Sequence, residues 1–313
     1  MADKIATRES YGSALVELAE KYDFVVMDAD LAEATKTVKF KKAYPERFFD
    51  CGIAEGNMMS VAAGIASTGK PVFVSSFAMF AAGRAFEQVR NSIGYPHLNV
   101  KIGATHAGIS VGEDGATHQC NEDIALMRTI PGMTIINPSD GAEARAAVEA
   151  ALQMDGPVYL RFGRFATPII NDTPDYKFEI GKGVQLADGT DVTIVATGLM
   201  VGMALEAREL LAAEGISTRV VNIHTIKPID KEIIVKAATE TGAIVTAEEH
   251  NIIGGLGGAV AEVVCENAPV PVVRVGVNDA YGHSGTVPAL FDAYGLTPAN
   301  IAANAKKAVE LKK

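Results

Sequence analysis

Short apolar stretches alternate with longer amphipathic stretches along the first half of the chain. The apolar stretches cover residues 24–28, 71–76, 98–104, 133–137 and 158–162. The amphipathic stretches cover residues 8–22, 55–67, 79–93 and 141–153, and a further helix is expected from about Asn121. Strands that are apolar throughout and alternate with helices are typical of a parallel sheet covered on both faces. The pattern predicts a doubly wound α/β domain.

The alternation lapses at residues 166–183, where proline, glycine and polar residues accumulate as they do in linkers. It then resumes, with apolar stretches at residues 192–198, 218–223, 243–249 and 270–276 and helical patterns at residues 203–215, 231–242 and 254–264. Thr297 before Pro298 is a helix-start signature. We therefore expect two doubly wound α/β domains, at residues 1–168 and 189–313, joined by a linker at residues 169–188.

The net charge narrows the possible partners. A formal net charge of −10 disfavours a nucleic-acid surface, because a protein that binds a phosphate backbone needs a basic face. Any phosphate must then be bound by individual side chains. Arg8, Arg161 and Arg164 are candidates, because a guanidinium can donate two parallel hydrogen bonds to a phosphate. Most arginines, however, are simply solvent-exposed.

The cysteines and the hydropathy of the chain indicate the cellular compartment in which the protein is expected. Cys51, Cys120 and Cys265 are odd in number and include no close pair, which argues against a disulfide framework or a thiolate zinc site. The first ten residues are polar, and no apolar run approaches the roughly 18 residues of a membrane span. We expect a cytoplasmic protein with neither export nor membrane insertion.

Titratable side chains gather in the segment HAGISVGEDGATHQ, residues 106–119. It holds His106, His118, Glu113 and Asp114 among three glycines. Glycine allows left-handed turns and a close approach of the backbone to a ligand, while imidazoles and carboxyls transfer protons and bind hydroxyls. No two of these side chains have the spacing of metal ligands on a helix or hairpin, so we expect a substrate site without a metal.

Three other features each allow a structural and a functional interpretation. Glu55 opens an apolar helix, either to complement the helix dipole or as a partly desolvated carboxyl that shares a proton with a ligand. Phe77 and Phe80 either pack in the core or contact a flat ring. The GGLGGAV segment, residues 254–260, has Val260 where the dinucleotide fingerprint needs glycine or alanine, and is better explained as a turn that starts a helix.

Taken together, the motifs resemble the C-terminal half of transketolase. The resemblance rests on IATRESYGSALVELA, DADLAEATKT, ERFFDCGIAEGNMMSVAAGIA, SSFAMFAAGRAFEQVRNSI, THAGISVGEDGATHQCNEDIALMR and PVYLRFGR, and continues through TIKPID and AEEHNIIGGLGGAVAE. It implies a pyrimidine-binding domain followed by a transketolase C-terminal domain. It also implies thiamine diphosphate as the cofactor and the transfer of a two-carbon ketol unit from a ketose to an aldose.

The resemblance assigns roles to individual residues. Glu55 matches the carboxyl that hydrogen-bonds the aminopyrimidine of the cofactor, and Phe77 and Phe80 match the aromatic residues packed against that ring. His106, Asp114 and His118 match residues that contact the sugar, with the two histidines assisting proton transfer. Arg8 and Arg161 match the arginines that hold the sugar phosphate.

Several positions depart from the family pattern. Ala34 replaces a common phosphate-binding serine, Gly83 replaces a frequent cofactor-facing aromatic residue, and Gly56 follows Glu55 where bulkier residues are usual. These changes predict a wider pocket and make a branched or sulfonated sugar a candidate substrate.

The chain also lacks the Gly-Asp-Gly segment with a downstream asparagine that holds magnesium and the diphosphate in such enzymes; GEDG with Asn137 is the nearest approach. The resemblance therefore implies a split enzyme. A separate N-terminal-type subunit would hold Mg²⁺ or Ca²⁺ and the diphosphate, and the pairs would form a heterotetramer.

Three alternatives remain. The β subunit of a 2-oxoacid dehydrogenase shares the GIAE segment but has no need of two histidines that contact sugar hydroxyls. Deoxyxylulose phosphate synthase shares the later part of the 106–119 segment, but its chain normally includes the diphosphate-binding domain. A catalytically silent interaction module is disfavoured because all the matched site residues are retained at once.

Overall fold

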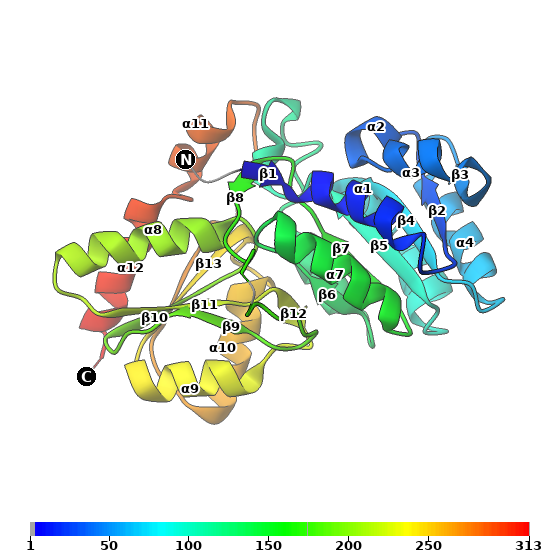
Figure 1. Cartoon of the computed structure of the whole chain (residues 1–313). Helices are drawn as coiled ribbons and strands as arrows, with labels where there is room; N and C mark the ends of the chain where they lie inside the picture. The colour runs from blue at the N-terminus through cyan, green and yellow to red at the C-terminus, as the bar shows by residue number, and fades with distance from the viewer. Residues whose placement is uncertain (1–3, 174, 313) are drawn as a thin grey trace.

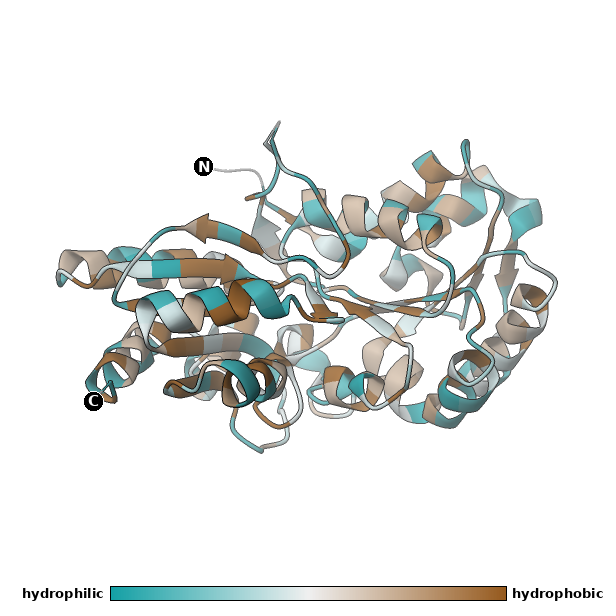
Figure 2. Ribbon diagram, turned by 90° about the horizontal axis from the view of Figure 1, so that it is seen from below, coloured by the Kyte–Doolittle hydropathy of each residue, from teal (hydrophilic) through white to brown (hydrophobic). Residues whose placement is uncertain are grey.

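The computed structural model describes residues 4–173 and 175–312, which form two α/β domains side by side (Figure 1). Each domain has a central sheet with helices on both faces, so the predicted fold class is confirmed. Figure 2 shows that hydrophobic residues gather along the strands, whereas hydrophilic residues recur on the outer turns of the helices.

The sheet of the first domain has seven strands in the order β12-β6-β7-β5-β4-β2-β3. Six of them are mutually parallel, and β12 pairs antiparallel with β6. The strands are β2 (Val25–Asp28), β3 (Phe48–Asp50), β4 (Val72–Phe77), β5 (Val100–Thr105), β6 (Thr134–Ile136), β7 (Val158–Arg161) and β12 (Thr225–Lys227). Because β12 comes from beyond the predicted linker, the second domain completes the edge of the first sheet, which the hydrophobic pattern did not predict.

Two apolar layers cover this sheet. On one face α1 and α7 pack around Tyr11, Leu15 and Phe24, and on the other α4 and the segment 79–94 pack around Met58, Met59 and Val74. The helices are α1 (Thr7–Leu18), α2 (Ala32–Thr35), α3 (Val38–Ala43), η1 (Pro45–Arg47), α4 (Glu55–Ala66), α6 (Asp123–Arg128) and α7 (Gly141–Gln153).

The segment 79–93 differs from its prediction as one amphipathic helix. It forms two π-helical turns, η2 (Met79–Arg84) and η3 (Val89–Gly94), on either side of the short α5 (Phe86–Gln88). π-Helical turns insert an extra residue and are frequent at functional sites. Here the first one carries Phe80 and Arg84, both of which enter the candidate site.

The sheet of the second domain has five strands in the order β14-β13-β10-β11-β9, with β9 antiparallel at its edge. Helices α8 and α12 cover one face, and α9 and α10 the other (Figure 1). The strands are β9 (Val184–Ala187), β10 (Val192–Ala196), β11 (Thr218–Asn222), β13 (Ile244–Asn251) and β14 (Val272–Val277). The helices are α8 (Met200–Ala213), α9 (Lys231–Thr241), α10 (Leu256–Asn267), α11 (Val287–Tyr294) and α12 (Pro298–Glu310).

The two domains share one apolar core as well as the strand β12. The largest buried cluster joins Met127 and Ile130 of the first domain to Leu256 and Val260 of the second. A small antiparallel pair joins β1 (Lys4–Ala6) to β8 (Ala166–Pro168), which lies directly before the predicted linker. This shared core sets how residues of the second domain approach the candidate site.

Across residues 4–173 and 175–312, no helix has the length and apolar character needed to cross a bilayer. Cys51, Cys120 and Cys265 are free thiols.

Candidate active site

The predicted residues of the first domain meet at the carboxyl edge of its parallel sheet. Phe77 ends β4, His106 follows β5 directly, and Glu55 opens α4 a few residues after β3. Open α/β sheets bind ligands at this edge, because the loops that follow parallel strands converge there. The parallel register therefore brings together side chains that lie far apart in the sequence.

Glu55 is buried, with 2% of its surface exposed. Its two oxygens accept hydrogen bonds from one nitrogen of Arg84, at 3.0 and 2.9 Å. The Arg84 side chain is itself half exposed, and its guanidinium lies 4.3 Å from the centroid of the Phe80 ring. The buried carboxylate thus has a counter-ion on a side chain that reaches in from the surface.

Aromatic rings form a stack beside this carboxylate. The Phe77 and Phe80 rings lie 5.8 Å apart at 15°, and the Phe77 and His106 rings lie 3.9 Å apart at 29°. His118 meets the edges of both phenylalanines, with centroids at 6.1 and 5.4 Å. Flat apolar faces and two imidazoles are therefore gathered at one place, as an aromatic heterocycle would require.

The contacts of His106 select one tautomer of its ring. Arg8 has only donors, so its contact of 2.7 Å with Nε2 requires that this nitrogen be unprotonated. Nδ1 then carries the proton and donates to the Thr105 hydroxyl at 2.9 Å. Burial, reinforced by the charge of Arg8, lowers the pKa of His106 to about 3. His106 is therefore neutral at physiological pH.

The segment that joins His106 to His118 depends on unusual backbone angles. His106 has φ 57°, and Gly108, Gly112 and Gly115 have φ 79°, 84° and 77°. A non-glycine residue in the left-handed region is strained and must be held by its surroundings, whereas glycine adopts such angles freely. The glycines therefore allow the 3₁₀ segment η4 (Ile109–Asp114) to turn back toward the aromatic stack.

Two arginines contact residues of the 106–119 segment. Arg8 donates to the Ala34 carbonyl at 3.0 Å as well as contacting His106. Arg164 donates to the Val111 carbonyl at 2.8 Å and approaches the Asp114 carboxylate at 3.4 Å. Arg8, His106, His118 and Asp114 therefore occupy neighbouring elements, and Arg164, one of the three candidate arginines in the sequence, joins them.

Arg161 lies apart from these residues. It is buried, and its guanidinium donates to the Asp123 carboxylate at 2.8 and 3.2 Å and to the Glu249 carbonyl at 2.9 Å. Burial alone would raise the pKa of Asp123, but the charge and hydrogen bonds of Arg161, with the contributions of His250 and the Tyr159 hydroxyl, together lower that pKa. These bonds use Nε and one of the two terminal nitrogens of Arg161, so most of the guanidinium is committed, and contact of Arg161 with a sugar phosphate stays a prediction.

A cavity of about 830 Å³ opens next to Phe80 and Arg84, where the two domains meet. Asn121 and Glu122 line it from the first domain, and Asn251 and Tyr281 from the second. The side chain of Gln88 lies beside Gly56 and that of Met79 beside Gly83, and the wider pocket predicted from these glycines stays a prediction. Gln88 and Met79 are both flexible side chains, so each can change its conformation to make room for a ligand.

Two residues of the site were missed in the sequence. Arg84 contacts Glu55 because a π-helical turn returns it to the start of α4, and no sequence spacing signals that approach. Thr105 fixes the His106 tautomer, and its only sequence signal is its place directly before the histidine. In the part of the chain that is described, no three His, Cys, Asp or Glu side chains form a metal-binding group. The predicted division of the metal site between two chains stays a prediction.

Family comparisons agree with this arrangement. Residues 3–168 match the transketolase pyrimidine-binding domain, and residues 181–301 match the transketolase C-terminal domain. The fold and site thus define a pyrimidine-binding domain of the thiamine-diphosphate type with its C-terminal companion. The chain belongs to the transketolase family, as the C-terminal-type subunit of a two-chain transketolase.

Relatives of similar length support that placement. A putative transketolase C-terminal section from Methanocaldococcus jannaschii is 52% identical, with 94% of this chain and 93% of that protein covered. A 6-deoxy-6-sulfo-D-fructose transketolase subunit from a Clostridium strain is 45% identical (97% and 95% covered). An apulose-4-phosphate transketolase subunit from Phocaeicola vulgatus is 41% identical (98% of both covered).

Among solved structures, a split-gene transketolase described as an inactive β4 tetramer superimposes with a TM-score of 0.91. It is 54% identical in sequence, and the match covers 99% of this chain and 100% of that one.

Proposed function

We propose that this chain contributes the pyrimidine half of a thiamine diphosphate site and the sugar-contacting residues of a two-chain transketolase. The observation that carries the proposal is the buried Glu55 carboxylate, paired with a half-exposed arginine and set beside a stack of aromatic rings. The pyrimidine-binding domain match supports the same cofactor.

The residues present fit the aminopyrimidine end of the cofactor. Phe77 and Phe80 offer flat faces to its ring, and Glu55 offers an acceptor for a proton held at a ring nitrogen. Thiamine diphosphate, when bound, supplies a nucleophilic carbon for two-carbon transfer. For Glu55 to serve it, Arg84 must move aside, which its exposed position allows.

The neighbouring residues then act on the sugar. Neutral His106 and half-buried His118 would carry protons during the reaction, and Asp114 would accept from a sugar hydroxyl. Arg8 and Arg164 provide donors for an anionic end of the substrate, and Arg8 Nε has no partner among the described residues.

For the substrate we infer an anionic ketose with a sulfonate or phosphate terminus. Two relatives are named for transketolase reactions of a sulfonated fructose and of apulose 4-phosphate, which are anionic sugars. Ala34 removes a hydroxyl that commonly binds the phosphate in the family, which weakens the case for an ordinary sugar phosphate and leaves a sulfonated sugar a candidate. Sulfonate and phosphate both accept forked hydrogen bonds, so a substrate panel must distinguish them.

We further infer that a separate chain holds Mg²⁺ and the diphosphate, and that two pairs form a heterotetramer. Oxygen ligands and phosphates are what this hard cation requires. The Phocaeicola relative is itself named as one subunit of its transketolase, which supports a partner chain.

The test is reconstitution of the chain with a partner that carries the Gly-Asp-Gly segment. We expect ketol transfer in the mixture with thiamine diphosphate, Mg²⁺ and an anionic ketose, and none from either chain alone. Glu55→Ala should abolish turnover while the chain stays folded. Strong activity of the isolated chain would refute the two-chain proposal, and an inactive mixture across the panel would favour a silent module.

A further inference from the structure

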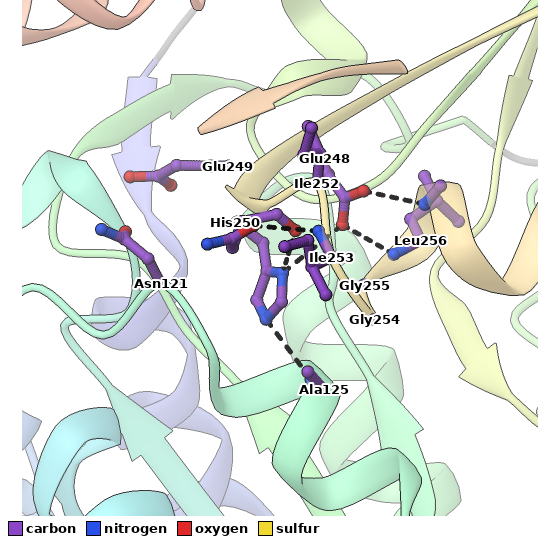
Figure 3. Close-up of polar contacts among 12 residues, drawn as sticks. Asn121, Ala125, Glu248, Glu249, His250, Ile252, Ile253, Gly254, Gly255 and Leu256 are labelled. Carbon is purple, nitrogen blue, oxygen red and sulfur yellow. Dashed lines mark hydrogen bonds and ion pairs between the residues drawn. The ribbon is translucent and has the colours of Figure 1, made fainter. Parts of the chain in front are cut away.

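The C-terminal domain contacts residues 106–118, here called the 106–118 segment, through α11, which packs against η4, and through one buried carboxylate. Near its end, strand β13 carries the consecutive buried residues Glu248, Glu249 and His250 (Figure 3). Figure 3 shows the side chains of Glu248 and Glu249 pointing in opposite directions, as strand alternation requires. The two acids therefore contact different parts of the molecule.

Glu248 is directed into its own domain. Its carboxylate accepts hydrogen bonds from the backbone N–H groups of Leu256 and Gly257, at 2.6 and 2.8 Å, where α10 begins. It thereby satisfies two donors that a helix start leaves without partners. Glu248 stabilises its own domain and is not in hydrogen-bond contact with the 106–118 segment.

Glu249 is directed across the domain boundary. Its carboxylate accepts from the backbone N–H of Ser110 at 2.5 Å, and Ser110 lies between His106 and His118 in the sequence. A Cβ at Gly108 would lie 2.5 Å from the carboxyl carbon of Glu249, so the segment fits closely against this side chain. The left-handed φ of Gly108, 79°, makes the same close approach possible.

The position of Glu249 is itself fixed from several sides. Its carbonyl accepts from Arg161, which is paired with Asp123 of the first domain. The next residue, His250, accepts from the backbone N–H of Ala125 at 3.3 Å (Figure 3). Glu249 is therefore a rigid support, and burial raises its pKa to about 7.

We propose that Glu249 is a positioning residue for the reaction, because it holds the segment that carries His106, Asp114 and His118 at the distance the sugar requires. This gives the C-terminal domain a role in the chemistry beyond subunit contact. The functional half of the inference rests on the proposed transketolase activity, whereas the contact with Ser110 does not.

The experiment compares Glu249→Ala with Glu248→Ala, a matched control that removes a neighbouring buried acid with a different target. In the reconstituted enzyme, E249A should raise KM for the ketose about tenfold or more and leave the affinity for thiamine diphosphate unchanged. E248A should lower thermal stability and leave KM unchanged. Glu249→Gln keeps a carbonyl acceptor for Ser110 and should restore KM to within about threefold of the wild type.

Amide hydrogen exchange of the chain provides a readout that does not depend on turnover. We expect the Ser110 amide to lose protection in E249A and to keep it in E249Q and E248A. If E249A does not fold, Glu249→Asp, which retains the charge but shortens the reach, replaces it and is compared with Glu248→Asp. Equal KM values in the two series, or a protected Ser110 amide in E249A, would overturn the proposal. An inactive wild-type complex would instead refute the proposed function. The hydrogen-exchange result would still test whether Glu249 holds the Ser110 backbone.

Discussion

The helix starts of α4 and α10 each contain or contact a buried glutamate, but the two acids are held in opposite ways. Glu248 gives both oxygens to backbone N–H groups at the start of α10. Glu55 gives both oxygens to the half-exposed side chain of Arg84. A side chain can rotate away for a ligand, whereas backbone donors of a packed helix cannot leave without unfolding it. Of these two acids, the one with the movable partner is the one available to a cofactor.

The largest effect is expected from removing the charge of Glu55, which tests whether this acid, unlike Glu248, is available to a cofactor. Glu55→Gln should lower turnover of the reconstituted enzyme by about 10²–10⁴-fold, the usual contribution of a positioned proton-transfer group. Its thermal stability should change little, because the Arg84 partner is half exposed and such pairs contribute little. Steady-state kinetics and a melting curve on the same preparation check both parts. A variant that is unstable but fully active would mean that Glu55, like Glu248, has a structural role rather than a catalytic one.

A third buried acid extends the comparison to the domain boundary. Asp123 is paired with the buried Arg161, so neither partner can move to solvent. Arg161→Met should cost about 3–5 kcal/mol of unfolding free energy, because it leaves an uncompensated buried carboxylate. Denaturant unfolding measures this loss. In the folded fraction the same change should raise KM for an anionic sugar less than Arg8→Met does, because Arg161 acts on the site only through its contact with the Glu249 carbonyl. A large KM effect with unchanged stability would restore Arg161 as a sugar-phosphate ligand.

The structural acid at α10 should show the complementary behaviour to Glu55. Glu248→Ala leaves two buried N–H groups without acceptors and should cost about 2–4 kcal/mol of unfolding free energy. Turnover per folded molecule should stay at the wild-type value. Urea unfolding, with activity normalised to the folded fraction, checks the pair of results. Stability equal to that of the wild type would mean that α10 does not depend on this carboxylate.

The pH dependence of stability should also identify Glu248. Burial raises its pKa to about 7, above the ordinary value of 4.5, so the folded state binds its proton more tightly than the unfolded state. The stability from this proton is fully present below about pH 4.5 and is lost as the pH rises through about 7. Unfolding free energy measured from pH 5 to 8 should therefore fall less steeply in Glu248→Gln. An unchanged slope would contradict the assignment.

The smallest effect is expected at Arg84. Arg84→Met removes the partner of a buried carboxylate, but that partner is half exposed, so the loss of unfolding free energy should stay below that of Arg161→Met, at about 1–2 kcal/mol. Calorimetric melting of the chain measures it. A loss of several kcal/mol would show that Arg84 is a fixed structural partner of Glu55, and the distinction between the two helix starts would fail.

Much of the fold was predictable because the central strands are apolar on both faces. The apolar runs at residues 71–76 and 158–162 predicted β4 and β7, and the bounds of these strands differ from the runs by only a few residues. Edge strands such as β9 and β12 were missed, because they are short and only partly apolar. The π-helical turns of residues 79–94 were also missed, because the spacing of their apolar residues predicts an ordinary α-helix.

For the candidate site, resemblance to a family identified single residues but not their partners. Glu55, Phe77 and His106 could be named because they occur in recognisable motifs. Arg84 and Glu249 could not, because each reaches the site only through tertiary structure, one by a π-helical turn and the other across the domain boundary. Arg161 shows the converse, since a matching position does not indicate whether its guanidinium is already committed.

The central claim is that Glu55 supplies the acceptor for the cofactor's aminopyrimidine ring. A crystal structure of the reconstituted two-chain complex with thiamine diphosphate and Mg²⁺ tests it most directly. We predict a ring nitrogen within hydrogen-bond distance of the Glu55 carboxylate, the ring against Phe77 and Phe80, and Arg84 displaced from its present contact. A ring bound elsewhere, with the Arg84 and Glu55 pair intact, would contradict the account.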